Sequence, residues 1–272
     1  MSYKVEDIVR FTEEFAPMEL AEDWDNVGLM TGIYENKVER ILAALDISDD
    51  VIDEAIEKKC DMIITHHPMI FKSIKNVNSG SIIGRRLIKL IKNDIAVYSA
   101  HTNLDIARGG TNDTFAELLG LKNRVNLCES VNESGEGLGK VGDMDKEITF
   151  AELINKVKDI TKLDKLAVSG DLNRTVKRIG IGTGSCCKYE YFKRAKDKGC
   201  DAYISSDMGY HDAQSAMAVG LCVIDATHYA SEVLVIPVIC KYLFCRIYIK
   251  IFSLKPQMRI YGIFHFFFDI LQ

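Results

Sequence analysis

The sequence predicts an α/β protein built from two related three-layer lobes. Short apolar runs alternate with amphipathic helical patterns over residues 40–100, and this alternation is typical of a largely parallel sheet covered by helices. The segment 41–65 also resembles the segment 181–205 after a shift of 140 residues without a gap. In that alignment Ala55, Lys58 and Cys60-Asp61 meet Ala195, Lys198 and Cys200-Asp201. We therefore interpret the two lobes as an internal duplication.

The elements of the first lobe can be placed by periodicity. An amphipathic pattern with early acids predicts a helix within residues 1–17. Strands are expected over the apolar runs at 40–47, 61–65 and 95–100, and helices over 49–60 and 82–94.

Composition divides the chain into three parts. The polar, glycine-rich stretch 126–146 predicts a loop or hairpin at a boundary. We expect a first α/β lobe over 1–125 with the first half of a metal site, and a second over 126–242 with the other half, whose C-terminal strand could return to the first lobe. Residues 243–272 form an atypical tail with eight aromatic residues, against sixteen in the preceding 242. Our hypothesis is that this tail is aberrant, for example a frameshifted reading of a final strand and turn.

Charge and cysteine usage exclude several classes of function. The net charge of −5 and the pI near 5.7 provide no basic surface for a phosphate backbone, so nucleic acid is not expected as the primary partner. Eight cysteines without a C-x-x-C spacing indicate reduced thiols, and the N-terminus lacks the pattern of a signal peptide. Basic residues interrupt the apolar tail too often for a membrane span. We expect a cytoplasmic protein with no membrane association.

Histidines and acids gather where strands are predicted to end. His66 and His67 follow the strand at 61–65, His101 is followed four residues later by Asp105, and His228 likewise by Glu232. The carboxyl ends of strands in α/β sheets face one crevice, so these side chains could converge there. Imidazole and carboxylate ligands suit zinc, iron, manganese, cobalt or nickel, and two such ions commonly lie about 3.5–4 Å apart in hydrolytic sites.

A simpler interpretation is that each histidine only caps a strand end or forms a local hydrogen bond. Neighbouring side chains on an extended strand also point to opposite faces, so His66 and His67 could share a site only if the chain turns there. Pro68 gives the chain a reason to leave the strand.

Five ordered motifs carry a resemblance to a known family over roughly residues 1–242. The motifs are AEDWDNVGLMTG, DMIITHHPMIFKS, YSAHTNLDIARGGTND, GIGTGSCC and DATHYASE. Together they resemble the GTP cyclohydrolase I type 2 homologues, a family of dinuclear-metal proteins. The resemblance implies a homohexameric toroid and a cleft between two α/β lobes that holds two divalent metal ions per chain. The implied metal ligands are His66, His67, Asp105, His228 and Glu232, and the implied catalytic residue, a proton shuttle or neighbour of the ligands, is His101.

Hydrolysis is the reaction class that such a site favours, because a divalent ion activates water. The resemblance implies opening of the guanine imidazole ring of GTP with loss of formate, and hence a small-molecule, nucleotide-like substrate. Two alternatives stay open: hydrolysis of a phosphoester or pyrophosphate, and a regulatory or scaffold protein that binds metal without catalysis.

Four other features have competing interpretations. The turn at 180–185 is either a phosphate-binding loop or a tight strand-to-helix turn. Asp25 and Asn26 could order a loop at the mouth of the site, whereas Trp24 is expected to be a packing anchor. For His211 we expect a local hydrogen bond near the start of a helix.

Overall fold

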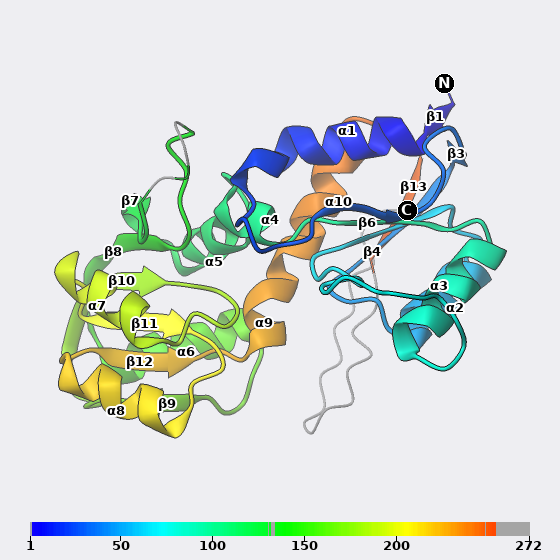
Figure 1. Cartoon of the computed structure of the whole chain (residues 1–272). Helices are drawn as coiled ribbons and strands as arrows, with labels where there is room; N and C mark the ends of the chain where they lie inside the picture. Colours follow the sequence, from blue (N-terminus) through cyan, green and yellow to red (C-terminus); the bar gives the residue numbers. More distant parts are fainter. Residues whose placement is uncertain (1, 130, 132–133, 248, 254–272) are drawn as a thin grey trace. The chain divides into compact units, whose positions relative to one another are not determined.

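The computed structural model describes residues 2–129, 131, 134–247 and 249–253 (Figure 1). The chain folds into two compact units, which confirms the predicted α/β class with two lobes. Of the described residues, unit 1 comprises those up to Thr12, those in 26–100 and those in 239–253; unit 2 comprises those in 13–25 and 101–238. Helices α1 (Val5–Phe15) and α10 (Ile236–Phe244) each begin in one unit and end in the other.

Unit 1 is built on a five-stranded sheet in the order β13-β4-β5-β6-β2. All neighbouring strands are parallel except β2, which pairs antiparallel with β6. The strands are β2 (Gly28–Thr31), β4 (Arg40–Ala44), β5 (Met62–Thr65), β6 (Ala96–Ser99) and β13 (Lys250–Ser253). A separate antiparallel pair joins β1 (Tyr3–Lys4) to β3 (Lys37–Val38).

Helices α2 (Asp49–Glu57) and α3 (Ile82–Lys92) contact each other and cover one face of this sheet. Each begins at a serine cap: Ser48 Oγ accepts from the Val51 amide at 3.1 Å, and Ser81 does the same for α3. Ile63 of β5 packs into the cluster under these helices, while its neighbours Met62 and Ile64 are equally buried on the opposite face. Burial on both faces is what a parallel sheet requires.

The final strand of unit 1 comes from the C-terminal part of the chain. Strand β13 pairs parallel with β4, with Phe252 beside Leu42, and Phe252 packs against the cluster under α2 and α3. The ammonium nitrogen of Lys58 lies 4.9 Å from the centroid of the Phe252 ring. The rest of the aromatic tail, from residue 254, lies outside the described residues.

Unit 2 is built on a six-stranded sheet in the order β7-β8-β10-β11-β12-β9. Strands β10, β11 and β12 are parallel, and β7, β8 and β9 complete the sheet with antiparallel pairing. The strands are β7 (Lys122–Asn126), β8 (Lys140–Thr149), β9 (Ala167–Ser169), β10 (Thr175–Ile181), β11 (Ala202–Ser205) and β12 (Cys222–Asp225). The helices are η1 (Met18–Leu20), α4 (Thr102–Ile106), α5 (Thr111–Leu119), α6 (Phe150–Thr161), α7 (Tyr189–Asp197), α8 (Tyr210–Ala218), α9 (His228–Glu232) and η2 (Val233–Val235).

Two hydrophobic clusters make unit 2 a three-layer structure. Ile204 of β11 packs with α5 and α6, whereas its neighbour Tyr203 packs with α7 and α8. The alternation follows from the strand, whose successive side chains point to opposite faces. Figure 1 shows α7 and α8 over one face of this sheet.

The internal duplication is visible in equivalent hydrogen bonds of the two units. In unit 1 the Asp61 carboxylate accepts from the amides of Glu39 and Arg40 at 2.8 and 2.9 Å, and the Arg40 side chain donates to the Lys59 carbonyl. In unit 2 the Asp201 carboxylate accepts from the amides of Lys177 and Arg178 at 2.9 and 3.0 Å, and the Arg178 side chain donates to the Lys198 carbonyl. Equivalent bonds therefore fix Arg40, the first residue of β4, against the end of α2 and Arg178, the fourth residue of β10, against the end of α7.

The alignment without a gap is correct for one strand and wrong for the other. Met62 and Ala202, which begin the equivalent regions of β5 and β11, are 140 residues apart. Their partners Ile41 of β4 and Ile179 of β10 are only 138 residues apart. The first strands are thus shifted by two residues, because the connections that follow them differ in length.

All eight cysteines are free thiols. No helix among the described residues combines the length and the apolar character needed to cross a bilayer.

Candidate metal centre

The histidine pair of unit 1 lies just beyond the end of β5. The strand ends at Thr65, whose hydroxyl donates to the His67 carbonyl at 3.0 Å and so stabilises a turn of the chain. The rings of His66 and His67 lie 4.9 Å apart, and each ring offers a nitrogen within 4.8 Å of the other. Because the chain turns here, the two adjacent side chains do not point to opposite faces as they would on a strand. Unit 1 therefore brings His66 and His67 together.

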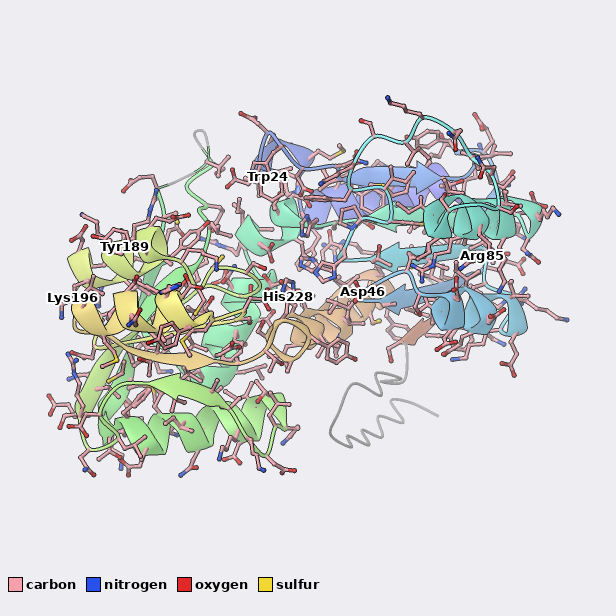
Figure 2. The ribbon with its side chains drawn as sticks, turned by 60° about the horizontal axis from the view of Figure 1, so that its bottom comes forward. Trp24, Asp46, Arg85, Tyr189, Lys196 and His228 are labelled. Atoms are coloured by element: carbon pink, nitrogen blue, oxygen red, sulfur yellow. The ribbon has the colours of Figure 1, made fainter. Side chains whose placement is uncertain are left out.

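Hydrogen bonds fix the tautomer of both rings. His66 Nδ1 lies 2.9 Å from the Ala100 carbonyl oxygen, and His67 Nδ1 lies 2.8 Å from Oδ1 of Asp46, which follows β4 (Figure 2). A carbonyl and a carboxylate can only accept, so Nδ1 carries the proton in each ring. The basic nitrogen of each neutral imidazole is then Nε2, which is the arrangement found in metal-ligating histidines.

Helix α9 carries the ligand candidates His228 and Glu232 on one face. They are separated by four residues, and His228 Nε2 lies 3.1 Å from Glu232 Oε2. On its other side His228 Nδ1 lies 2.8 Å from Oδ2 of Asp207, which follows β11. The hydrogen bond with Glu232 raises the pKa of His228 to about 9 against the opposing effect of burial, and Asp207 adds to the rise. A metal ion at Nε2 would displace the proton that this ring shares with Glu232.

Asp105 is the second carboxylate of unit 2, and its surroundings are polar and buried. The Thr111 hydroxyl donates to Asp105 Oδ1 and lies 2.9 Å from the hydroxyl of Thr183. The Asn112 side chain donates to the Asp105 carbonyl at 3.0 Å. Carboxylate oxygens of Asp105 and Glu232 lie within 4.8 Å of each other. Unit 2 therefore brings Asp105, His228 and Glu232 together, with Glu232 as the residue that is close to both others.

The turn at 180–185 supports these ligands instead of binding phosphate. The amides of Gly182, Thr183 and Gly184 donate to the Ile204 carbonyl, the Asn112 side chain and the Ser231 hydroxyl, at 2.9, 2.9 and 3.3 Å. Because all three amides already have acceptors within unit 2, they are not available to cradle a phosphate, and the hypothesis of a tight turn is the correct one.

His101 has a different position from His228, although the spacing to the following acid is the same. His101 precedes α4, whereas His228 is the first residue of α9. Its Nδ1 lies 2.8 Å from Oδ1 of Asp25, so Nδ1 carries the proton here as well. The side chain of Asp25 is fully buried and also accepts from the amide and the hydroxyl of Thr102, at 3.0 and 2.5 Å. Burial would raise the pKa of Asp25, but the hydrogen bonds from His101 and Thr102 lower it to about 2.

The remaining predicted residues are found in less central roles. Asn26 belongs to unit 1, where its side chain donates to the Ile70 carbonyl. Trp24 is not a buried anchor: it is 60% exposed, and its ring lies edge-on to His101 with centroids 6.3 Å apart. His211 on α8 lies 3.1 Å from the Gln214 side chain, in the local hydrogen bond that was expected.

Sequence reasoning missed the carboxylates that hold the histidines. Asp46 and Asp207 were not predicted to contribute, and Asp25 was given only as a residue that could order a loop. For Asp46 and Asp207 the available signal was an acid two residues beyond a buried strand, at the same end of the sheet as the histidines; Asp25 precedes β2 and had no such signal. That signal is weak, because acids are common in such loops.

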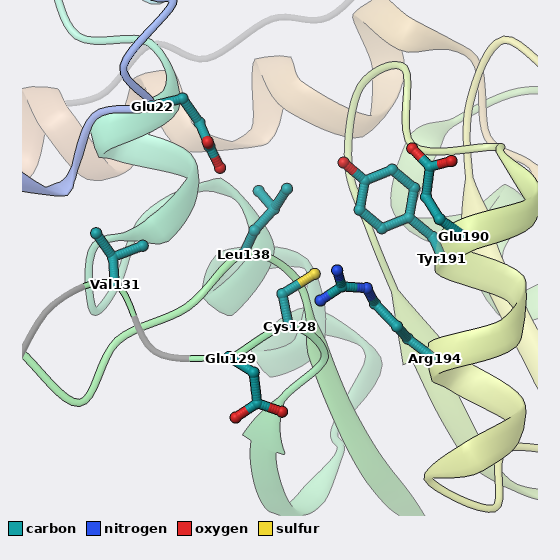
Figure 3. Close-up of a pocket in the computed structure, with 8 residues that line it drawn as sticks. All are labelled: Glu22, Cys128, Glu129, Val131, Leu138, Glu190, Tyr191 and Arg194. Atoms are coloured by element: carbon teal, nitrogen blue, oxygen red, sulfur yellow. The ribbon is translucent and has the colours of Figure 1, made fainter.

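A cavity of about 360 Å³ lies in unit 2. Its lining includes the carboxylates of Glu22, Glu129 and Glu190 and a single guanidinium, that of Arg194. Figure 3 shows this guanidinium directed toward the sulfur of Cys128. Burial raises the pKa of that thiol, and Arg194 opposes the rise only in part. With three acids and one base, the lining does not suit a polyphosphate.

The fold and these groups define an α/β protein of two units with buried histidine and carboxylate groups that could hold a metal ion. The chain belongs to the Duf34/NIF3 (NGG1p interacting factor 3) family, whose sequence model matches residues 3–255. The match confirms the family resemblance found in the sequence and extends it beyond residue 242, through β13.

Relatives share most of their length with this chain. The protein named GTP cyclohydrolase 1 type 2 homolog of Clostridium perfringens is 41% identical over 229 residues, which are 84% of this chain and 87% of the relative. Its counterpart in Clostridium acetobutylicum is 40% identical over 233 residues, which are 85% and 86%. Among solved structures, a Bacillus cereus protein related to NIF3 has a TM-score of 0.87 at 26% identity, with 97% of this chain and 99% of that chain covered. Reduced HcgD from Methanocaldococcus jannaschii has a TM-score of 0.81 at 32% identity, with 93% and 98% covered.

Proposed function

We propose that this chain is a dinuclear divalent-metal protein and a metal-dependent hydrolase. The ligands in this proposal are His66 and His67 of unit 1 and Asp105, His228 and Glu232 of unit 2. The observation that supports it best is a hydrogen bond shared by all four histidines at the strand ends. In each of them Nδ1 lies 2.8–2.9 Å from a carboxylate or carbonyl oxygen. This bond selects Nε2 as the ligand atom and orients the ring, as outer partners do in metal sites.

The donor set fits a pair of divalent ions. Imidazole nitrogens mixed with carboxylate oxygens suit zinc, iron, manganese, cobalt or nickel, and the set contains no thiolate. Two carboxylates balance part of the charge of the ions, and the position of Glu232 close to both Asp105 and His228 suits a ligand shared by two ions.

The chemistry that this site would support is hydrolysis. Bound ions would lower the pKa of a coordinated water toward about 7 and so provide a nucleophile at neutral pH. His101 is the proposed general acid and base, because Asp25 keeps the proton on Nδ1 and leaves Nε2 to accept or donate one. Asp25 would also stabilise the imidazolium that forms when His101 accepts a proton.

The proposed substrate is a small molecule of the nucleotide class. The relatives are named GTP cyclohydrolase 1 type 2 homolog, and on that basis the reaction assigned is the opening of the guanine imidazole ring of GTP with release of formate. Phosphoester or pyrophosphate hydrolysis, and metal binding without catalysis, are the alternatives that the experiment below distinguishes.

The proposed assembly is a homohexameric toroid in the cytoplasm. Apolar side chains on the surface of unit 1 support self-association: Phe71, Val77 and Ile82 are 45%, 49% and 58% exposed. Light scattering on the purified protein measures the mass; a monomer would contradict this part of the proposal.

Metal content and product release test the function together. Wild type, His67→Ala and Glu232→Ala are purified, metal per chain is measured, and formate and phosphate are assayed after incubation with GTP. His211→Ala is the control, because that imidazole is exposed and bonds locally. We expect about two ions in wild type and the control, and loss of metal and formate in both variants. Phosphate without formate would favour the phosphohydrolase alternative, metal without product the binding protein, and absence of metal from wild type would refute the proposal.

A further inference from the structure

We propose that Gly184 is a positioning residue for the metal ligand Glu232: it has no side chain because the Glu232 carboxylate occupies the space where a Cβ would lie. This inference rests on the proposed function, and it adds a residue to which neither the family resemblance nor the donor set gives a role.

The local geometry leaves no room for a side chain. A Cβ built on Gly184 would lie 2.3 Å from Glu232 Oε1 and 3.7 Å from His228 Nε2. The first distance is far inside van der Waals contact, so the carboxylate would have to move. The backbone of the turn is also hydrogen-bonded to α9 next to Glu232, because the Gly184 amide donates to the hydroxyl of Ser231, the residue before Glu232.

Comparison with unit 1 shows that the glycine is not a requirement of the repeat itself. Gly184 lies five residues beyond Ile179 of β10, and the residue five beyond the equivalent Ile41 of β4 is Asp46. Unit 1 therefore has a full carboxylate side chain where unit 2 has none. The two positions differ in backbone conformation, because Gly184 has φ +68° and Asp46 does not have a positive φ. In unit 2 a side chain is therefore disfavoured both by the backbone and by the Glu232 carboxylate.

The residues that follow the second strand of each repeat also differ, with an imidazole in unit 1 and a carboxylate in unit 2. His67 lies five residues beyond Met62 of β5, and Asp207 lies five beyond the equivalent Ala202 of β11. In unit 1 the first strand supplies the carboxylate and the second the imidazole that it holds. In unit 2 the second strand supplies the carboxylate, which holds the imidazole of α9. The connection after the first strand supplies Gly184, which leaves room for Glu232, and Ser185, whose hydroxyl donates to Asp207 at 2.5 Å.

The identity of the obstructing atom predicts the effect of an alanine at residue 184. Glu232 Oε1 is the far end of a flexible side chain, so Gly184→Ala can be accommodated by rotation of the Glu232 side chain away from residue 184. The fold then survives, but the carboxylate leaves the place from which it would bind metal. The backbone also has φ +68°, which any side chain tolerates poorly, and this second effect needs a control.

Gly120→Ala is the matched control. Gly120 has φ +79° in the same unit, and an added Cβ there meets nothing within 4 Å. Titration of metal-free protein with Mn²⁺ should show affinity reduced about tenfold or more in Gly184→Ala and unchanged in Gly120→Ala, with similar decreases in Tm for the two metal-free variants. A crystal structure of metal-free Gly184→Ala should show the Glu232 carboxylate displaced.

Unchanged Mn²⁺ affinity in Gly184→Ala, or an equal loss in Gly120→Ala, would overturn the inference. If wild type binds no Mn²⁺, the proposed function fails, and the position of Glu232 in the variant crystal structure still decides the role of Gly184. If Gly184→Ala does not fold, the double variant with Glu232→Ala removes the obstructing carboxylate. Recovery of folding supports the inference, and continued failure refutes it.

Discussion

Asp25→Asn should remove a large part of the acid sensitivity of unit 2. The Asp25 carboxylate is fully buried, accepts three hydrogen bonds from His101 and Thr102, and has a pKa of about 2 in place of its ordinary 3.8. A difference of about two pKa units corresponds to about 2 kcal/mol of folding free energy. Because the folded-state pKa is lowered, this contribution is fully present above pH 4 and is lost as the pH falls toward 2.

The assay uses the single tryptophan of the chain. The Trp24 ring lies edge-on to the His101 ring, so its fluorescence reports on this part of unit 2 during urea unfolding. The protein is kept metal-free with a chelator, because a ligand that binds only the folded state would add its own stabilisation. At pH 7 the variant should be less stable than wild type by about 2 kcal/mol, and the difference should shrink between pH 4 and pH 2.

Asp23→Asn provides the control, since Asp23 is exposed on the same segment, and its unfolding should follow that of wild type at every pH. A stability difference between Asp25→Asn and wild type that stays constant from pH 7 to pH 2 would contradict the reasoning. It would show that the variant loses packing or hydrogen-bond geometry and that the charge of Asp25 contributes nothing.

Four further variants test the remaining contacts. Asp207→Asn removes the carboxylate that fixes the imidazole of α9, and Mn²⁺ titration should show affinity reduced about tenfold. Thr111→Val removes the hydroxyl that donates to buried Asp105, and urea unfolding should show a loss of about 1–3 kcal/mol. Asp61→Ala and Asp201→Ala each remove the acceptor of two backbone amides, and should lower stability by similar amounts, about 1–3 kcal/mol.

Each of these has an outcome that would count against it. Asp212→Asn is the control: it weakens the ion pair with Lys188 and the bond from the Gly209 amide, and it should leave Mn²⁺ affinity unchanged. An equal loss of affinity there would point to a general charge effect. A stable Thr111→Val protein would mean that another donor replaces the hydroxyl. Clearly unequal losses in Asp61→Ala and Asp201→Ala would show that the two repeats do not depend on this bond alike.

The periodicity of the sequence was sufficient for the class of fold and for the central parallel strands of unit 1, β4, β5 and β6. Runs such as 61–65 and 95–100 became β5 and β6 almost as predicted, because a strand buried on both faces leaves a continuous apolar signal. The two-residue shift in the first strand of the repeat was beyond such reasoning. It depends on the length of a connection, and apolar alternation does not record that length.

The histidines of the candidate site could be predicted from the sequence, whereas the carboxylates that form hydrogen bonds with them largely could not. Spacing alone made His101–Asp105 and His228–Glu232 look equivalent, yet one histidine precedes its helix and the other begins it. His101 lies two residues beyond β6 and His228 three residues beyond β12, and the two rings have different partners, Asp25 and Asp207. The spacing between a histidine and an acid does not record the length of the connection before the histidine, so this difference could only come from the structure.

The two repeats separate what holds the fold from what forms the site. Asp61 and Asp201 accept equivalent backbone bonds in the two units, from Arg40 of β4 and Arg178 of β10, and so act on the scaffold. Beyond the carboxyl ends of these strands the units differ, with Asp46 in one and Gly184 in the other. Asp46 lies six positions beyond Arg40, and Gly184 lies six beyond Arg178, at most about 20 Å of extended chain. Substitutions at the scaffold aspartates should therefore lower stability with little effect on Mn²⁺ affinity, whereas Asp207→Asn and Gly184→Ala, at the carboxyl ends, should reduce Mn²⁺ affinity. If both kinds of substitution changed stability and affinity in proportion, fold and site could not be separated in this way.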